Sequence, residues 1–215
     1  MEIYQHLTIG WKNMETKDYT QYGEQAKITE FFGNTVGRFL DVGAADGITY
    51  SNVYNLLLTG WSGLSIEPEA QAFHTILQNY KQFGDRSTLL NAVISTKEEF
   101  VKFYSHGQLS TTSNDHIKKW EDHLKTYNGE WNLSYSYSVT LNNVMAHFGT
   151  DYDFVSIDIE GRNYDLVASI NWNDLPKCKL VCIEHDSHEA ELLQYMKQYG
   201  FTEYFVNPVN LIVKR

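Results

Sequence analysis

The sequence predicts an α/β fold built on a mostly parallel, seven-stranded sheet that ends in an antiparallel hairpin. Apolar strand-like runs alternate with stretches of helical length, a pattern typical of βαβ units and parallel strands. The last two strands, at 201–206 and 211–213, are separated only by the turn over 207–210. So short a link cannot make the crossover that parallel strands require, and this pair is therefore expected to be antiparallel.

Each element of this alternation is bounded by residues that start or stop it. Gly33, Gly60 and Gly200 end helices, and Pro68 begins one. The expected helices are 24–32, 50–58, 69–80, 141–148, 164–170 and 189–199. The expected strands before the hairpin are 38–43, 63–67, 89–94, 154–158 and 180–184.

The regular pattern breaks over residues 98–141, called the insert below. It is expected to hold a strand at 100–104, an amphipathic helix at 115–127 and a tyrosine-rich extended piece at 134–141. An irregular segment of this length usually has a function, and the alternative is an addition with a purely structural role. Residues 1–22 are expected to form an N-terminal arm, and residues 23–215 a single domain.

Composition excludes several classes of function. A formal net charge of −10 argues against a protein that binds nucleic acid by neutralising phosphates. The chain shows no signal peptide and no membrane-span pattern, so a cytoplasmic protein is expected. Cys178 and Cys182 lie in one apolar run, where they are expected to occupy one face of a strand as buried small hydrophobes rather than a disulfide.

A glycine loop at 41–47 follows the first strand, where open α/β sheets bind their ligands. Its spacing, Gly43-x-x-x-Gly47, is not the GxGxxG of pyrophosphate binding. Carboxylates would repel a pyrophosphate but suit the ammonium and sulfonium of S-adenosylmethionine. Glu67 ends the second strand, where an acid can bind both ribose hydroxyls. The expected cofactor contacts in these segments are Asp41, Gly43, Ala44, Asp46, Gly47 and Glu67, with Asn91 and Ala92 beside the adenine.

Several carboxylates and a histidine end the fourth and fifth strands. Asp158 and Glu160 follow one strand, and Glu184, His185 and Asp186 follow the other. Such a group could remove a proton from an acceptor hydroxyl, for which Asp158, Glu160 and His185 are the catalytic candidates. It could also bind a divalent cation such as Mg²⁺ through Asp158, Glu184 and Asp186. Alternatively, Asp158 and Asp186 cap the helices that follow them.

Three motifs resemble those of FkbM-type methyltransferases. They are Phe39-Leu40-Asp41-Val42-Gly43-Ala44-Ala45-Asp46-Gly47 with Ser51-Asn52, then Gly60-Trp61-Ser62-Gly63-Leu64-Ser65-Ile66-Glu67-Pro68, and Val155-Ser156-Ile157-Asp158-Ile159-Glu160-Gly161. The resemblance implies a Rossmann-like class I methyltransferase that methylates an oxygen, often of a sugar or secondary metabolite. It implies cofactor contacts that include Ser51 and Asn52, and Asp158 and Glu160 near the methionine end or the acceptor. Ala45 and Arg162-Asn163-Tyr164 depart from the family pattern.

The predicted function is therefore S-adenosylmethionine-dependent O-methylation of a sugar, polysaccharide or secondary metabolite, with a small-molecule or carbohydrate acceptor as the partner. Two alternatives remain open at this point. A nicotinamide-dependent oxidoreductase is disfavoured by the glycine spacing and the terminal hairpin. A non-catalytic module that binds cofactor or carbohydrate could keep the fold without the reaction. The oligomeric state is not predicted.

Overall fold

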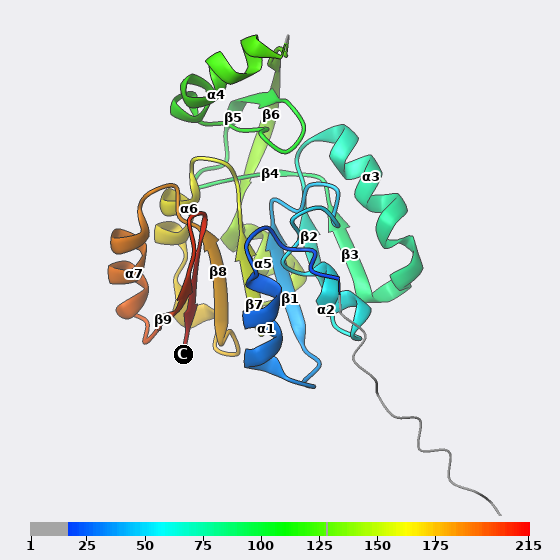
Figure 1. Ribbon diagram of the computed structural model, residues 1–215, viewed down its shortest axis with the longest axis vertical. Coiled ribbons are helices and arrows are strands. Elements are labelled where there is room, and N and C mark those ends of the chain that lie inside the picture. Colours follow the sequence, from blue (N-terminus) through cyan, green and yellow to red (C-terminus); the bar gives the residue numbers. More distant parts are fainter. Residues whose placement is uncertain (1–16, 128) are drawn as a thin grey trace, which may run out of the picture.

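The carboxyl ends of the central, parallel strands lie at the same edge of the main sheet (Figure 1). A computed structural model describes residues 17–127 and 129–215. Within these residues the main sheet has seven strands in the order β3-β2-β1-β7-β8-β10-β9. They are β1 (Arg38–Val42), β2 (Ser62–Ile66), β3 (Ser87–Leu90), β7 (Phe154–Ile157), β8 (Leu180–Glu184), β9 (Thr202–Val206) and β10 (Asn210–Lys214).

The pairing directions confirm the predicted architecture. β1 runs parallel to both β2 and β7, and β8 runs parallel to β7. β10 is antiparallel to both β8 and β9. The hairpin turn closes on Asn207, whose Oδ1 accepts hydrogen bonds from the N–H groups of Val209 and Asn210, at 2.9 and 2.7 Å. The strand order reverses between β1 and β7, which is the point where open α/β sheets bind ligands.

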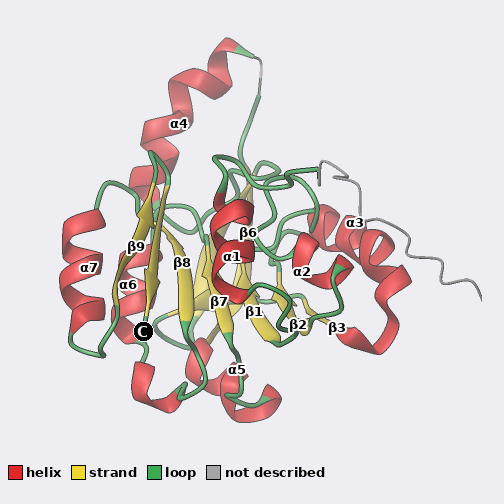
Figure 2. Ribbon diagram, turned by 60° about the horizontal axis from the view of Figure 1, so that its bottom comes forward, coloured by secondary structure: helices red, strands yellow, loops and turns green. Residues whose placement is uncertain are grey.

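Helices cover both faces of this sheet (Figure 2). One apolar core contains side chains from α1 (Glu24–Phe32), α2 (Tyr54–Leu58) and α3 (Ala70–Tyr80). The other contains side chains from α5 (Leu141–Phe148), α6 (Asn163–Ser169) and α7 (Glu189–Lys197). Successive residues of β1 alternate between them, with Phe39 in the first core and Leu40 in the second. A sheet buried on both faces explains why its strands read as continuous apolar runs.

The insert contributes to a smaller layer at the top of Figure 1. A second sheet has the order β4-β6-β5, and α4 connects β5 to β6 along the chain. The bounds are β4 (Val93–Ser95), β5 (Phe100–Ser105), α4 (Asn114–Thr126) and β6 (Asn132–Thr140). Short 3₁₀ turns lie at Lys81–Arg86 and Trp172–Asp174.

Two predicted elements were wrong in their bounds. The expected strand 89–94 is divided between two strands in different sheets. β3 stops pairing with β2 after Leu90, and Val93 of β4 then pairs with Ser138 of β6. The expected helix 50–58 begins only at Tyr54. Tyr50 has a left-handed φ of 59°, which interrupts a helix at that position.

The cysteines are free and buried, as predicted. Only Cys182 lies in β8, however, since Cys178 precedes the strand, and the expectation of a shared strand face was wrong. No helix in the described part of the chain is both long and apolar enough to cross a membrane. Most of the expected N-terminal arm, residues 1–16, lies outside the described residues.

A buried carboxylate joins the first helix to the last hairpin. Glu24 is fully buried, and its Oε1 accepts hydrogen bonds from the side-chain amides of Asn207 and Asn210, at 2.7 and 2.6 Å. Its Oε2 accepts one from the backbone N–H of Tyr22 at 2.8 Å. Burial acts to raise the pKa of Glu24, but these hydrogen bonds outweigh it and hold the pKa below its ordinary value.

We predict that Glu24→Gln destabilises the protein by about 2 kcal/mol at pH 7, because a neutral amide cannot accept all these hydrogen bonds. The exposed Glu30→Gln is the control, with an expected change under about 0.5 kcal/mol. Because the pKa of Glu24 is lower in the folded than in the unfolded protein, its carboxylate adds to the free energy of unfolding above the unfolded-state pKa. This contribution is lost as the pH falls through the folded-state pKa. Denaturant titrations at pH 7 and pH 3 should therefore show the Glu24→Gln difference shrinking in acid, and an undiminished difference would contradict this account.

Candidate functional site

A cavity of about 450 Å³ opens at the carboxyl ends of the central strands. The glycine loop and Glu67 line one part of it, and residues 107–112 of the insert line another. Gln21 and Tyr22, which precede α1, also reach it. The sequence-predicted site residues that line the cavity are Asp41, Gly43, Ala44, Ser51, Asn52, Glu67, Ala92, Asp158, Glu160 and Glu184.

The glycine loop is held between the ends of β2 and β7. The N–H groups of Gly43 and Ala44 both donate to the carbonyl of Ile66, at 2.9 and 3.0 Å. On the other side the N–H of Asp158 donates to the carbonyl of Val42 at 2.8 Å. Gly43 has a φ of 89°, and a Cβ added there would lie 1.6 Å from the carbonyl oxygen of Asp158. Only glycine fits this approach.

Two buried carboxylates lie beside this loop. Glu67 accepts hydrogen bonds from the N–H groups of Glu69 and Ala45, at 2.7 and 2.8 Å, so each of its oxygens keeps a lone pair for another donor. Burial raises the pKa of Glu67 to about 7. Burial, and then the charge of Glu67, raise the pKa of Asp41 to about 7. A positively charged ligand with hydroxyl groups would stabilise the ionised form of both side chains.

Three expected cofactor contacts support the site without lining the cavity. The Asp46 carboxylate accepts hydrogen bonds from the N–H groups of Ile48 and Thr49, which shapes the loop. Gly47 packs on α3, where an added Cβ would lie 2.5 Å from the Tyr80 ring. The side-chain amide of Asn91 donates to the carbonyl of Glu67 at 2.7 Å. Asp46 and Asn91 thus hold Thr49 and Glu67, which line the cavity, whereas Gly47 lets the loop pack against α3.

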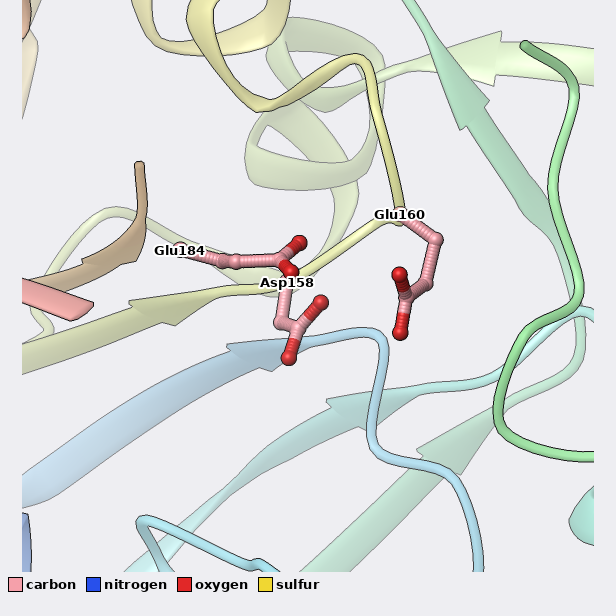
Figure 3. Close-up of side chains that lie close together, drawn as sticks. All are labelled: Asp158, Glu160 and Glu184. Carbon is pink, nitrogen blue, oxygen red and sulfur yellow. The ribbon is translucent and has the colours of Figure 1, made fainter. Parts of the chain in front are cut away.

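The carboxylates of Asp158, Glu160 and Glu184, called the acidic triad below, gather at the ends of β7 and β8 (Figure 3). One oxygen from each lies within 4.8 Å of the others. Burial, and then the neighbouring carboxylates, raise the pKa of Asp158 to about 7, of Glu160 to about 9 and of Glu184 to about 10. Asp158 Oδ1 is buried, and no side chain or backbone group in the described ranges forms a hydrogen bond with it.

Asp186, the third expected metal ligand, is not part of this triad. Its Oδ2 accepts a hydrogen bond from the side-chain amide of Asn163 at 2.8 Å, and Glu184 Oε2 accepts one from the same amide at 2.7 Å. Asn163 Oδ1 accepts from the N–H of Ile159 at 2.8 Å. Asn163 therefore joins the loops after β7 and β8, a role that no sequence motif indicated.

His185, an expected proton acceptor, does not line the cavity. Its Nδ1 accepts a hydrogen bond from the N–H of Ser187 at 3.2 Å, which leaves the proton on Nε2, 3.1 Å from the carbonyl of Asn207. Both ring nitrogens are therefore occupied by backbone groups. The geometry offers no free nitrogen on His185 for the reaction, so the catalytic candidates that line the cavity are Asp158 and Glu160.

The helix-capping alternative is not what the structure shows. α6 begins after Arg162 and α7 after His188, and neither helix has a side-chain hydrogen bond at its N-cap. Asp158 and Asp186 therefore do not cap these helices.

The insert supplies functional residues that sequence reasoning missed. Thr111 Oγ1 donates to the carbonyl of Glu160 at 2.6 Å. Lys119 and Trp120 of α4 line the cavity, and the indole Nε1 of Trp120 is buried with no hydrogen-bond partner in the described part of the chain. The apolar stripe of α4 predicted the helix but not which of its residues reach the site.

The fold and the site together define a class I methyltransferase that depends on S-adenosylmethionine. The sequence profile of the methyltransferase FkbM domain matches residues 41–203, well over half of the chain. The chain therefore belongs to the FkbM methyltransferase family, and the resemblance predicted from the three motifs is confirmed. A search of curated proteins finds no match.

Solved methyltransferases with similar folds have very different sequences. A TehB-like SAM-dependent methyltransferase from Corynebacterium glutamicum is 10% identical, with 90% of this chain and 88% of that chain covered and a TM-score of 0.46. Precorrin-6y C5,15-methyltransferase from Geobacter metallireducens is 12% identical, with 89% and 85% covered and a TM-score of 0.47. A Pyrococcus horikoshii protein named for a proposed role as an RNA methyltransferase is 10% identical, with 89% and 80% covered and a TM-score of 0.48.

We predict that Gly43→Ala abolishes measurable binding of S-adenosylhomocysteine, because the methyl group must displace the backbone of Asp158. The expected loss of stability is about 3 kcal/mol. Gly33→Ala is the control for backbone strain, since Gly33 has a positive φ of 55° but open space around its Cβ position, and it should cost about 2 kcal/mol without affecting binding. Calorimetric titration and thermal unfolding measure both effects. Unchanged binding in Gly43→Ala would show that the loop does not hold the ligand.

Proposed function

We propose that this enzyme transfers the methyl group of S-adenosylmethionine to a hydroxyl oxygen of a small-molecule or carbohydrate acceptor. The observation that carries this proposal is the acidic triad at the edge of the cavity, next to the glycine loop. Removing the proton of a hydroxyl as its oxygen attacks carbon is the task of a positioned carboxylate. An oxygen nucleophile also needs to be held close to the methyl carbon.

The residues around the glycine loop fit the cofactor. Bound S-adenosylmethionine supplies a methyl group on a positively charged sulfur. Glu67 has lone pairs for two ribose hydroxyls, and Asp41 brings a buried negative charge toward the cation. Ala92 follows β3, beside the place expected for the adenine. These contacts form one half of the cavity and leave the acidic triad for the acceptor half.

The acceptor half combines carboxylates with an aromatic wall. Asp158, Glu160 and Glu184 offer acceptors for hydroxyl groups, and Trp120 offers a ring face and a buried N–H donor. Lys119 is the single Lys or Arg among the described residues that line the cavity, against five carboxylates. A hydroxylated ring without phosphates suits this wall, whereas the backbone of a nucleic acid would be repelled.

We predict that Asp158→Asn lowers methyl transfer by at least about 100-fold, the usual effect of losing a positioned acid or base. Binding of S-adenosylhomocysteine should stay within about threefold, and thermal unfolding should show an intact fold. The measurement is transfer of labelled methyl from S-adenosylmethionine to pooled sugars, oligosaccharides and hydroxylated metabolites, with calorimetry alongside. The control is Asp165→Asn, since Asp165 is exposed and pairs with Arg162.

Three results would contradict the proposal in different ways. Full transfer by Asp158→Asn would remove the assigned role of this carboxylate. Transfer only to nitrogen or carbon acceptors would retain a methyltransferase but reject methylation of oxygen. Cofactor binding without transfer to any pool would favour the non-catalytic module instead.

The proposal includes a divalent cation such as Mg²⁺ at the acidic triad. Three carboxylate oxygens lie within 4.8 Å of one another, and Asp158 Oδ1 is buried without a hydrogen bond from the described residues. Oxygen ligands of this kind are those that Mg²⁺ and Mn²⁺ prefer. A cation bound there would replace the protons that otherwise reduce repulsion between the carboxylates, and could hold the acceptor oxygen.

We predict that Mg²⁺ or Mn²⁺ binds more tightly as pH rises from 6 to 8. The pKa values of the triad are raised, so protons must leave before the cation can bind. Calorimetry in buffers of different ionisation heat should record this proton release. Glu184→Gln should weaken binding at least about tenfold, whereas the exposed Glu191→Gln on α7 should not. Affinity that is absent, or independent of pH, would reject the cation and leave proton removal by a carboxylate.

A further inference from the structure

We infer that His116 of the insert is a positioning residue that holds the Glu160 carboxylate toward Asp158 and Glu184. This inference deepens the proposed function and rests on it, because the chemistry of the acidic triad is part of that proposal. His116 Nε2 lies 3.5 Å from Glu160 Oε2, and the side chain is only 2% exposed. No hydrogen-bond partner for this nitrogen exists within residues 17–127 and 129–215. The two atoms are therefore in contact without forming a hydrogen bond, and a small movement of the Glu160 side chain is needed to form one.

The backbone around His116 is fixed against the loop that carries Glu160. His116 lies in the first turn of α4, and its N–H donates to Oγ of the N-cap residue Ser113 at 3.3 Å. A Cβ added to Gly161 would lie 2.9 Å from the Cβ of His116, so the helix start packs directly on this loop. Thr111 holds the same loop through the Glu160 carbonyl. These contacts fix the position of His116 relative to the loop that carries Glu160.

His116 acts on Glu160 rather than as a fourth member of the acidic triad. The group of mutually close ligand atoms contains Asp158, Glu160 and Glu184, and His116 is not part of it. Groups that hydrogen-bond to a ligating or reacting carboxylate commonly orient it, and their loss typically costs about 10–100-fold in metal affinity or activity. One N–H on Nε2 would do this for Glu160 without placing an atom in the ligand space.

The charges around His116 agree with a neutral donor. Burial, and then the neighbouring ammonium of Lys119, lower the pKa of His116 to about 4, while Asp186 acts in the opposite direction. Glu160 faces the ring from the loop after β7. A neutral imidazole with its proton on Nε2 adds a hydrogen bond without adding a charge to the triad.

Amide substitutions separate this role from simple packing. In His116→Gln the side-chain N–H reaches approximately the position of Nε2, whereas His116→Asn is one methylene shorter and falls short of Glu160. We predict that Mn²⁺ affinity in His116→Gln stays within about threefold of the wild type and falls about 10–100-fold in His116→Asn and His116→Leu. Binding of S-adenosylhomocysteine should be unchanged in all three, and the exposed His74→Gln on α3 is the control. Equal losses in the Gln and Asn variants would overturn the positioning role.

A second measurement does not depend on any cation. Long-range ¹H–¹⁵N spectra of protein labelled at histidine report which ring nitrogen carries the proton, and the signal absent from His116→Gln identifies His116. In spectra recorded above pH 9, where the Glu160 carboxylate is ionised, we expect the Nε2–H form, and a shift of that signal in Glu160→Gln but not in Glu191→Gln. A proton on Nδ1, or a signal insensitive to Glu160, would reject the inference. If the wild type binds neither Mn²⁺ nor S-adenosylhomocysteine, the proposed function fails while this spectrum still decides the role of His116.

Discussion

The close approach of Gly43 to the carbonyl of Asp158 is the constraint on which the rest of the site depends. It brings the turn after β1 against the end of β7, where the strand order reverses. The two hydrogen bonds to Ile66 and the one to Val42 fix this approach from both sides. Because of it, the glycine loop and the residue that begins the acidic triad are fixed relative to each other. Catalysis needs such fixed geometry, since a small misplacement of reacting groups is costly.

The site concentrates features that oppose folding. Five carboxylates line one cavity, and burial raises the pKa of each of them. The non-glycine residues with positive φ in the described chain also gather near it; they are Ala45, Tyr50, Glu160, Asp186 and Ser187. Strained backbone and mutual repulsion of this kind persist only where the surroundings impose them. Here the two apolar cores that enclose the sheet, and the bonds of Glu24 between α1 and the hairpin, supply the opposing stability.

The parts that could be predicted from sequence are those governed by periodicity and strand ends. The alternating segments and the short final turn were enough to predict the sheet. Glu67 and Asp158 could be placed at the cavity because they follow parallel strands. His185 also follows a strand, yet the left-handed turn at Asp186 and Ser187 directs its ring to the backbone. His116, Thr111 and Trp120 had no such signal, because the packing of the insert on the loop after β7 involves residues about 50 positions apart. Only tertiary structure brings them together.

The second sheet has a consequence for how such enzymes diverge. It joins the main domain through β4 at one end and the start of α5 at the other, and it carries none of the residues that hold the glycine loop. Under the proposed function, the stretch between these two joints belongs to the acceptor half of the cavity, so its sequence could change, and the acceptor with it, without altering the contacts that hold the glycine loop. A segment grafted from a relative would need to keep two contacts with the loop that carries Glu160, which are the hydrogen bond from the Thr111 hydroxyl and the packing of His116 against Gly161.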